Sequence, residues 1–160
     1  ITTTKVADNN ITAVKTHGET IGITTTGIKC VKIVTAAGLK ALLSGADESL
    51  FQLPIGSTLI NFTLYVPTAS TAAATIKIGF DSDLNYMGLG AADDDGIITA
   101  VTVNAAPISV ECHNVTYDGA AVQAGTLTAL ATGYITVLSS VDLTADATFS
   151  GYAIVEYLEA

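Results

Sequence analysis

Short apolar and β-branched segments, separated by turn residues, run through most of this chain. Turn formers such as Pro67, Pro107, Gly133 and the Asp118-Gly119 pair stand between them. Seven or eight strands about 8–15 residues apart, without amphipathic helices between them, are typical of an all-β antiparallel β-sandwich or jelly roll. We expect strands over residues 57–66, 75–79, 97–104, 108–117, 121–131, 135–141 and 149–158.

The first third of the chain is less regular. Residues 1–27 are polar and rich in Thr, which predicts an extended N-terminal arm ahead of a β-sandwich domain over residues 28–160. Residues 28–35 (IKCVKIVT) are apolar on both faces and predict a strand that is covered on two sides. Residues 36–53 are ambiguous: their leucines fit a helical turn, whereas Gly38 and Gly45 fit strands joined by turns. We favour strand and loop there.

Charge is sparse and unevenly distributed. Apolar residues make up 49% of the chain and charged residues 13%. Residues 1–40 hold five Lys against two carboxylates, a charge of +3, whereas residues 41–160 hold one Lys against 13 carboxylates, a charge of −12. This distribution fits either a first segment that is merely solvated or an arm that contacts an acidic surface of another subunit. For the second case we predict Lys5, Lys15, Ile11 and Val14 as interface residues.

The same composition argues against three classes of protein. The chain has no Arg, and an acidic body without guanidinium groups disfavours a nucleic-acid partner. No stretch approaches the roughly 20 apolar residues that a membrane-spanning helix needs. The first residues carry no positively charged segment followed by an apolar core, so the sequence predicts no secretory signal.

The best candidate for a metal site is Asp81-Ser-Asp83-Leu-Asn85, which matches the first ligand positions of an EF-hand loop. Tyr86 stands where the sharp turn needs Gly, and Ala92 where a bidentate Glu belongs. A helix-flanked calcium loop is therefore excluded. A looser site shared with residues 93–95 is the alternative to an ordinary solvated loop, and we predict no bound metal and no other cofactor.

Neither a catalytic centre nor a disulfide framework is visible. Cys112 and His113 are neighbours in a predicted strand, so their side chains point to opposite faces and form a poor dyad. His17 lies in the polar arm. Cys30 and Cys112 are too far apart for a paired metal-ligand motif, and we expect free buried thiols. The chain is predicted not to be an enzyme.

Two further groups of polar residues have two interpretations each. Asp93-Asp94-Asp95-Gly96 provides a carboxylate cluster, but such a run is more typical of the tip of a hairpin loop. Tyrosine rings suit either a protein or glycan contact or core packing with the hydroxyl at the rim. Both interpretations stay open for all six tyrosines, Tyr65, Tyr86, Tyr117, Tyr134, Tyr152 and Tyr157.

Three stretches, FQLPIGSTLINFTLYV, ATIKIGFDSDLNYM and the closing FSGYAIVEYLEA, resemble small structural proteins of tailed phages. The shared pattern is a Leu-Pro-x-Gly turn that opens a strand, an Ile-Gly strand followed by an Asp-rich loop, and a Gly-containing last strand that ends in Val-Glu-Tyr. The resemblance covers residues 51–158 and implies a capsid decoration, or cement, protein of the virion. It implies a homotrimer that binds the major capsid protein on the capsid surface after assembly in the host cytoplasm.

Two other functions fit parts of the sequence. An exported bacterial surface or pilus-like subunit would also be rich in strands and Thr, and an oxidised Cys30–Cys112 pair would favour it. A carbohydrate-binding jelly-roll module of a virion fibre would use the Asp81 loop and tyrosines. The absence of Trp argues against that module, because sugar rings commonly stack on indole.

Overall fold

The structure, a computed structural model, describes residues 28–81, 92–105, 107–112, 118–120 and 133–159, and the predicted arm lies outside them. The helix and strands of these residues are β1 (Ile28–Val34), α2 (Ala36–Ala41), β2 (Asp47–Leu53), β3 (Thr58–Thr68), β4 (Thr75–Phe80), β5 (Asp93–Thr102), β6 (Ile108–Glu111), β7 (Gly133–Ser139) and β8 (Ser150–Glu159). Six of the seven predicted strands agree with these bounds in part or in full; residues 113–117 and the predicted strand at 121–131 are not described.

The eight strands pair like one long hairpin that is folded across itself. Strand β1 pairs with β8, β2 with β7, β3 with β6 and β4 with β5, all antiparallel. The additional pairs β3·β8 and β4·β7 join them into two sheets, in the orders β1-β8-β3-β6 and β2-β7-β4-β5. This is the arrangement of an eight-stranded jelly roll, and the predicted fold class is confirmed.

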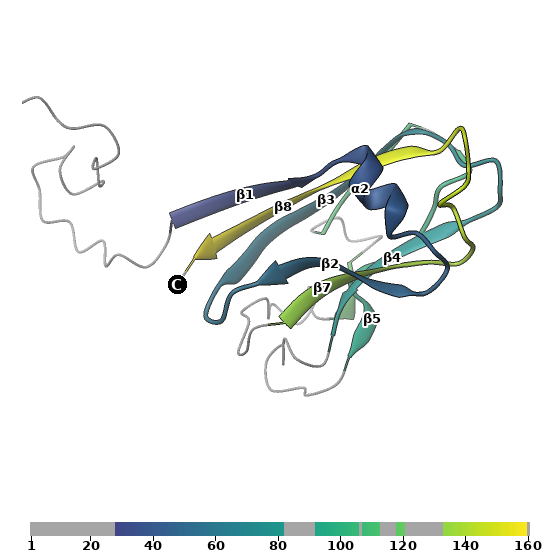
Figure 1. Cartoon of the computed structure of the whole chain (residues 1–160). Coiled ribbons are helices and arrows are strands. Elements are labelled where there is room, and N and C mark those ends of the chain that lie inside the picture. The colour runs from purple at the N-terminus through teal and green to yellow at the C-terminus, as the bar shows by residue number, and fades with distance from the viewer. Residues whose placement is uncertain (1–27, 82–91, 106, 113–117, 121–132, 160) are drawn as a thin grey trace, which may run out of the picture.

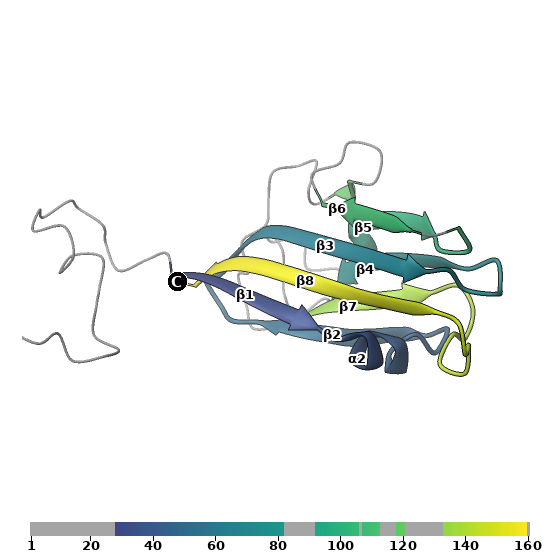
Figure 2. The same cartoon turned by 90° about the horizontal axis from the view of Figure 1, so that it is seen from above.

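The hydrophobic core lies between the two sheets (Figures 1 and 2). Along β8, side chains alternate between buried and partly exposed, because successive residues of a strand point to opposite faces. Strand β3 shows a similar alternation. The largest fully buried side chains are Phe62, Phe80, Leu39, Leu43, Leu53, Leu59, Leu64, Ile76, Ile78 and Ile97.

The expectation of strand and loop over residues 36–53 is wrong in its first part, which forms α2. Thr35 caps this helix: its hydroxyl accepts a hydrogen bond from the Gly38 N–H at 3.3 Å. Leu39 and Leu43 are fully buried beside the sandwich, and this burial stabilises a helix too short to be stable alone. Tertiary contacts therefore override the Gly38 turn signal. In the described residues, no helix is long and apolar enough to cross a membrane.

Residues 93–96 are not the tip of a hairpin loop, as the sequence suggests, but the first residues of β5. Asp93 pairs with Phe80 of β4, and the ladder between these strands is irregular. A side chain at Gly79 would collide with the backbone of Asp93, and one at Gly96 with the Phe80 ring. These two glycines allow the close approach that draws the acidic run into the sheet.

Strand β1 lies at the edge of its sheet, and the prediction that both of its faces are covered is wrong. The side chains of Val31 and Ile33 are 50% and 65% exposed. Cys30 and Val34, on the other face, pack against the core. The apolar residues of β1 thus divide between the core and the surface.

Candidate functional site

Of the candidate metal ligands Asp81, Asp83 and Asn85, the structure describes only Asp81, because the other two lie outside the described residues. Asp81 follows the end of β4. Its Oδ1 accepts a hydrogen bond from the Tyr134 N–H at 3.1 Å, and its own N–H donates to the Tyr134 carbonyl at 3.0 Å. Asp81 thus continues the pairing of β4 with β7 by one residue.

Asp93, Asp94 and Asp95 form the cluster of carboxylates that could hold a metal ion, with one oxygen of each within 4.8 Å of the others. The Lys77 ammonium already lies there, 3.1 Å from Asp94 and 3.3 Å from Asp95. Its hydrogen bond to Asp94 is the main cause of the raised pKa of Lys77, so the lysine stays charged. A protein cation therefore balances part of the charge of this cluster.

Burial raises the pKa of Asp93, and the adjacent carboxylates of Asp95 and Asp94 raise it further. The Asp95 N–H opposes this shift by donating a hydrogen bond to Asp93 Oδ1 at 3.2 Å. Such self-contained bonding within the cluster is typical of a structural turn into a strand.

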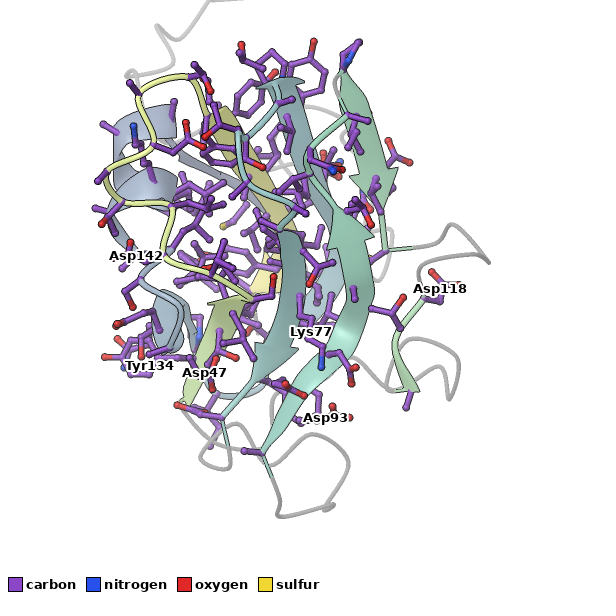
Figure 3. The ribbon with its side chains drawn as sticks, turned by 90° about the vertical axis from the view of Figure 1, so that its right-hand side faces the viewer. Asp47, Lys77, Asp93, Asp118, Tyr134 and Asp142 are labelled. Atoms are coloured by element: carbon purple, nitrogen blue, oxygen red, sulfur yellow. The ribbon has the colours of Figure 1, made fainter. Side chains whose placement is uncertain are left out.

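A wider acidic surface continues across the β2-β7-β4-β5 sheet. Burial, followed by the charges of Asp94, Asp81 and Glu48, raises the pKa of Asp47 at the start of β2. Tyr134 on β7 is 37% exposed. Figure 3 shows Asp47, Tyr134, Lys77 and Asp93 on the side of the sandwich that the β2-β7-β4-β5 sheet forms. We call Asp47, Asp94, Asp95 and Tyr134 the acidic face.

The exposed residues of β1 form a second surface of opposite charge. We call Lys29, Val31, Lys32 and Ile33 the basic strip. Lys29 makes an ion pair with Glu156 of β8 at 2.8 Å. Lys32 has no ion-pair partner among the described residues, and its side chain is exposed. By strand alternation Lys32 lies on the same side of β1 as Cys30 and Val34, opposite Lys29, Val31 and Ile33.

The outer side of the β1-β8-β3-β6 sheet extends the apolar part of the basic strip. Ile33 lies opposite Ile154 of β8. Tyr152, on the same face of β8, pairs with Tyr65 of β3, and their ring centroids are 5.1 Å apart. Tyr157 instead packs in the core, 5.6 Å from the ring of Phe51. Core packing is therefore confirmed for Tyr157, whereas a protein or glycan contact stays a prediction for the more exposed tyrosines, Tyr65, Tyr134 and Tyr152. Tyr86 and Tyr117 lie outside the described residues.

Both cysteines are free thiols, as the sequence indicates. Cys112 is fully buried, and burial raises its pKa to about 11. The Phe62 N–H donates to its Sγ at 3.2 Å, and its thiol donates to Asn61 Oδ1 at 3.6 Å. A protonated, hydrogen-bonded thiol is a poor nucleophile. Cys30 is only partly buried, which corrects the expectation of two buried thiols.

The four predicted interface residues, Lys5, Ile11, Lys15 and Val14, lie outside the described residues, and His17 and His113 do as well. The exposure of Val31 and Ile33 was not predicted from the sequence. The segment IKCVKIV nevertheless contains a signal for an exposed strand face. Lys29 and Lys32 fall on opposite faces of a strand, so neither face can be wholly buried, and the strand must lie at an edge.

No protein-family model and no curated protein sequence matches the chain. Chains of three phage capsids are among the solved structures with a similar fold. The first, from the acid-stable capsid of Helicobacter pylori bacteriophage KHP30, has a TM-score of 0.56 at 11% identity and covers 84% of this chain and 90% of that one. The second, from the capsid of cyanophage Pam1, has a TM-score of 0.54 at 15% identity, with coverage of 86% and 89%.

The third, from the capsid of Ralstonia phage GP4, has a TM-score of 0.51 at 15% identity, with coverage of 82% and 83%. At such identities the likeness concerns the fold. It extends over most of each chain, so the whole sandwich is shared rather than one motif. The chain therefore shares its fold with one chain from each of three phage capsids. Its resemblance to small phage virion proteins is confirmed at the level of the fold.

Proposed function

We propose that this chain is a structural protein of a phage head, a decoration protein that binds the outside of the shell as a homotrimer. The observation that carries the proposal is the fold shared with chains of three phage capsids over more than four fifths of each chain. The proposed partners are the major capsid protein and further copies of this chain, and neither nucleic acid nor membrane takes part. Its proposed place is the capsid surface, reached by assembly in the host cytoplasm.

The composition of the surface supports a binding role. Val31 and Ile33 are 50% and 65% exposed. They lie near Ile154 on the outer face of the β1-β8-β3-β6 sheet. Apolar side chains of this kind gain free energy when a partner covers them. The role requires no reaction, and we propose that the chain is not an enzyme.

Stabilisation of the shell would follow from mass action. A ligand that binds only the assembled lattice stabilises it by RT ln(1 + [L]/Kd), about 2.7 kcal/mol per site when the free protein is at 100 times its Kd. Several contacts per oligomer add avidity. The arm residues Lys5 and Lys15, with Ile11 and Val14, are proposed to contact the shell and to speed docking by charge attraction.

The test uses heads assembled without this chain. Purified protein should co-sediment with such heads and raise the temperature at which they release their contents. Docking should be slower for the Lys5→Glu/Lys15→Glu variant at low salt, and the difference should shrink at about 1 M salt, where the Debye length is about 3 Å. Absence of co-sedimentation, with heads whose thermal stability is unchanged, would refute a decoration role.

A further inference from the structure

The basic strip and the acidic face are complementary in charge and are both incompletely covered. In the strip, Val31 and Ile33 lie on the same side of β1 as Lys29, which is paired with Glu156, and Lys32 stands on the other side of this edge strand without an ion-pair partner among the described residues. The acidic face offers three carboxylates on the sheet that also carries the partly exposed ring of Tyr134. Lys77 neutralises only part of the acidic face, since one ammonium bridges two carboxylates while Asp47 lies nearby. Two lysines against Glu156 leave a net charge of +1 on the strip, and Lys77 against three carboxylates leaves −2 on the acidic face. Each surface thus combines exposed apolar groups with a net charge opposite to that of the other, as protein contacts do.

The two surfaces belong to different sheets of the sandwich. The basic strip lies on β1, an edge of the β1-β8-β3-β6 sheet, whereas the acidic face lies on the β2-β7-β4-β5 sheet. Figure 1 shows β1 in the upper layer and β4 and β5 in the lower one. The core between the layers keeps the strip and the face of one chain apart. Contact between them therefore requires two copies.

Charge also excludes the simplest alternative, a pairing of β1 with β1 of another copy. Such a pair would bring Lys29 and Lys32 of both copies together, and like charges on adjacent strands repel. Lys32 in addition lies on the core side of an edge strand, a placement that protects an open edge against strand addition. The partner of the strip must therefore carry carboxylates.

We propose that the basic strip of one copy docks on the acidic face of a second copy. In this contact Lys29 and Lys32 lie against Asp47, Asp94 and Asp95, and Val31 and Ile33 cover the ring of Tyr134. The two surfaces differ, so the contact is heterologous and leaves a free strip and a free face at the ends, which a ring closes. The inference rests on the homotrimer proposed above and names the surface through which its copies join.

Charge reversal on each side provides the test, carried out on the full chain without shells. The strip variant is Lys29→Glu/Lys32→Glu, and the face variant is Asp47→Lys/Asp94→Lys. Each should lower the association constant by about tenfold or more, because attraction becomes repulsion. Sedimentation velocity at micromolar concentration should then show monomers for each variant alone. An equal mixture of the two should associate again, because the basic strip of the face variant meets the acidic face of the strip variant, and the acidic strip of the strip variant meets the basic face of the face variant.

In that mixture contacts between unlike variants are complementary and contacts between like variants are repulsive, so a closed ring of three copies always keeps one repulsive contact and should form less readily than the parent oligomer. A quadruple variant that carries all four changes restores the charges at every contact and should recover the parent oligomer. Glu111→Lys/Asp142→Lys is the matched control: it alters charge by the same amount as the face variant at exposed positions on β6 and beyond β7. It should stay as oligomeric as the parent.

Circular dichroism and melting curves of every variant establish that it is folded. A monomeric parent, a strip variant that associates as the parent does, or a monomeric quadruple variant that is folded would each overturn the inference. A strip variant that keeps the parent's oligomer but fails to bind shells would also overturn it and would assign the strip to the shell. A monomeric strip variant that still binds shells would support the inference and leave the decoration role standing.

Discussion

The Lys77 ammonium lies 3.1 Å from a carboxylate oxygen of Asp94, and this contact joins β4 to the start of β5. A second oxygen, from Asp95, lies 3.3 Å away. The three acidic residues enter the sheet because glycines allow the backbones to approach, and the lysine lowers the cost of gathering their charges there.

Replacing Lys77 by Met should therefore destabilise the fold most at low salt. The two lost contacts are partly exposed, so the loss should be about 1 kcal/mol or less. It should shrink at about 1 M salt, where the Debye length is about 3 Å. Urea unfolding at both salt concentrations measures the effect, with Lys32→Met as the matched control. An equal loss at both salt concentrations would show that Lys77 acts through packing of its stem and not through charge.

Asp93 should make the stability of the fold depend on pH. Its pKa in the folded protein is raised, chiefly by burial, so the unfolded chain releases this proton at lower pH than the folded one. The stability of the fold therefore declines as the pH rises from about 4 through the folded pKa. Asp93→Asn keeps an acceptor for the Asp95 N–H and removes this decline. We expect a gain of about 0.5 kcal/mol at pH 7 and none below the window, measured by urea unfolding. A variant less stable than the parent at pH 7 would contradict this.

Asp146 organises the connection that precedes β8. Its carboxylate accepts hydrogen bonds from the Thr71 N–H at 2.8 Å, the Thr148 N–H at 2.9 Å and the Phe149 N–H at 3.1 Å. The bonds from Thr71 and Thr148 hold the pKa of Asp146 below its usual range. Its contribution to stability is thus complete above about pH 4 and is lost as the pH falls toward the folded pKa.

Asp146→Ala should accordingly lower the melting temperature at pH 7 and flatten its dependence on pH below 4. Asp142→Ala is the control, because within the described part of the chain that exposed carboxylate accepts hydrogen bonds only from Thr144, two residues away, whose N–H lies at 2.8 Å. The loss for Asp142 should be smaller. Thermal melting from neutral to acid pH measures both variants, and equal losses would mean that the bonds to Thr71, from a distant part of the chain, add nothing.

The correction at β1 can be checked by truncating one buried and one exposed residue. Leu64 of β3 is fully buried, and Leu64→Ala should cost about 2–5 kcal/mol. Ile33 is 65% exposed, and Ile33→Ala should cost less than about 1 kcal/mol in the isolated chain. Chemical unfolding at concentrations where the protein is monomeric compares the two. A large cost at Ile33 would mean that another part of the chain covers it.

Local pattern predicted the fold class because alternation in β3 and β8 and the turn residues between strands are visible without any tertiary information. Helix α2 was missed because its stability comes from burying Leu39 and Leu43, which depends on contacts with distant strands. The start of β5 was missed for a similar reason, since Gly79 and Gly96 act across a strand pair. Complementary charge on the two sheets could not be predicted before strand order placed Asp47 near Asp94.

The nested pairing of the strands also sets an order of events during folding. The pair β4·β5 closes the shortest loop and can form early, whereas β1·β8 joins Ile28 to Glu159 and must wait for the inner pairs, because closing a long loop costs more entropy. Amides of β4 and β5 should become protected from hydrogen exchange before those of β1, and simultaneous protection would contradict this order. The edge that carries the basic strip is then the last part of the molecule to form. A subunit would be able to join its neighbours only after its own folding is complete, so half-folded chains would be kept out of the assembly.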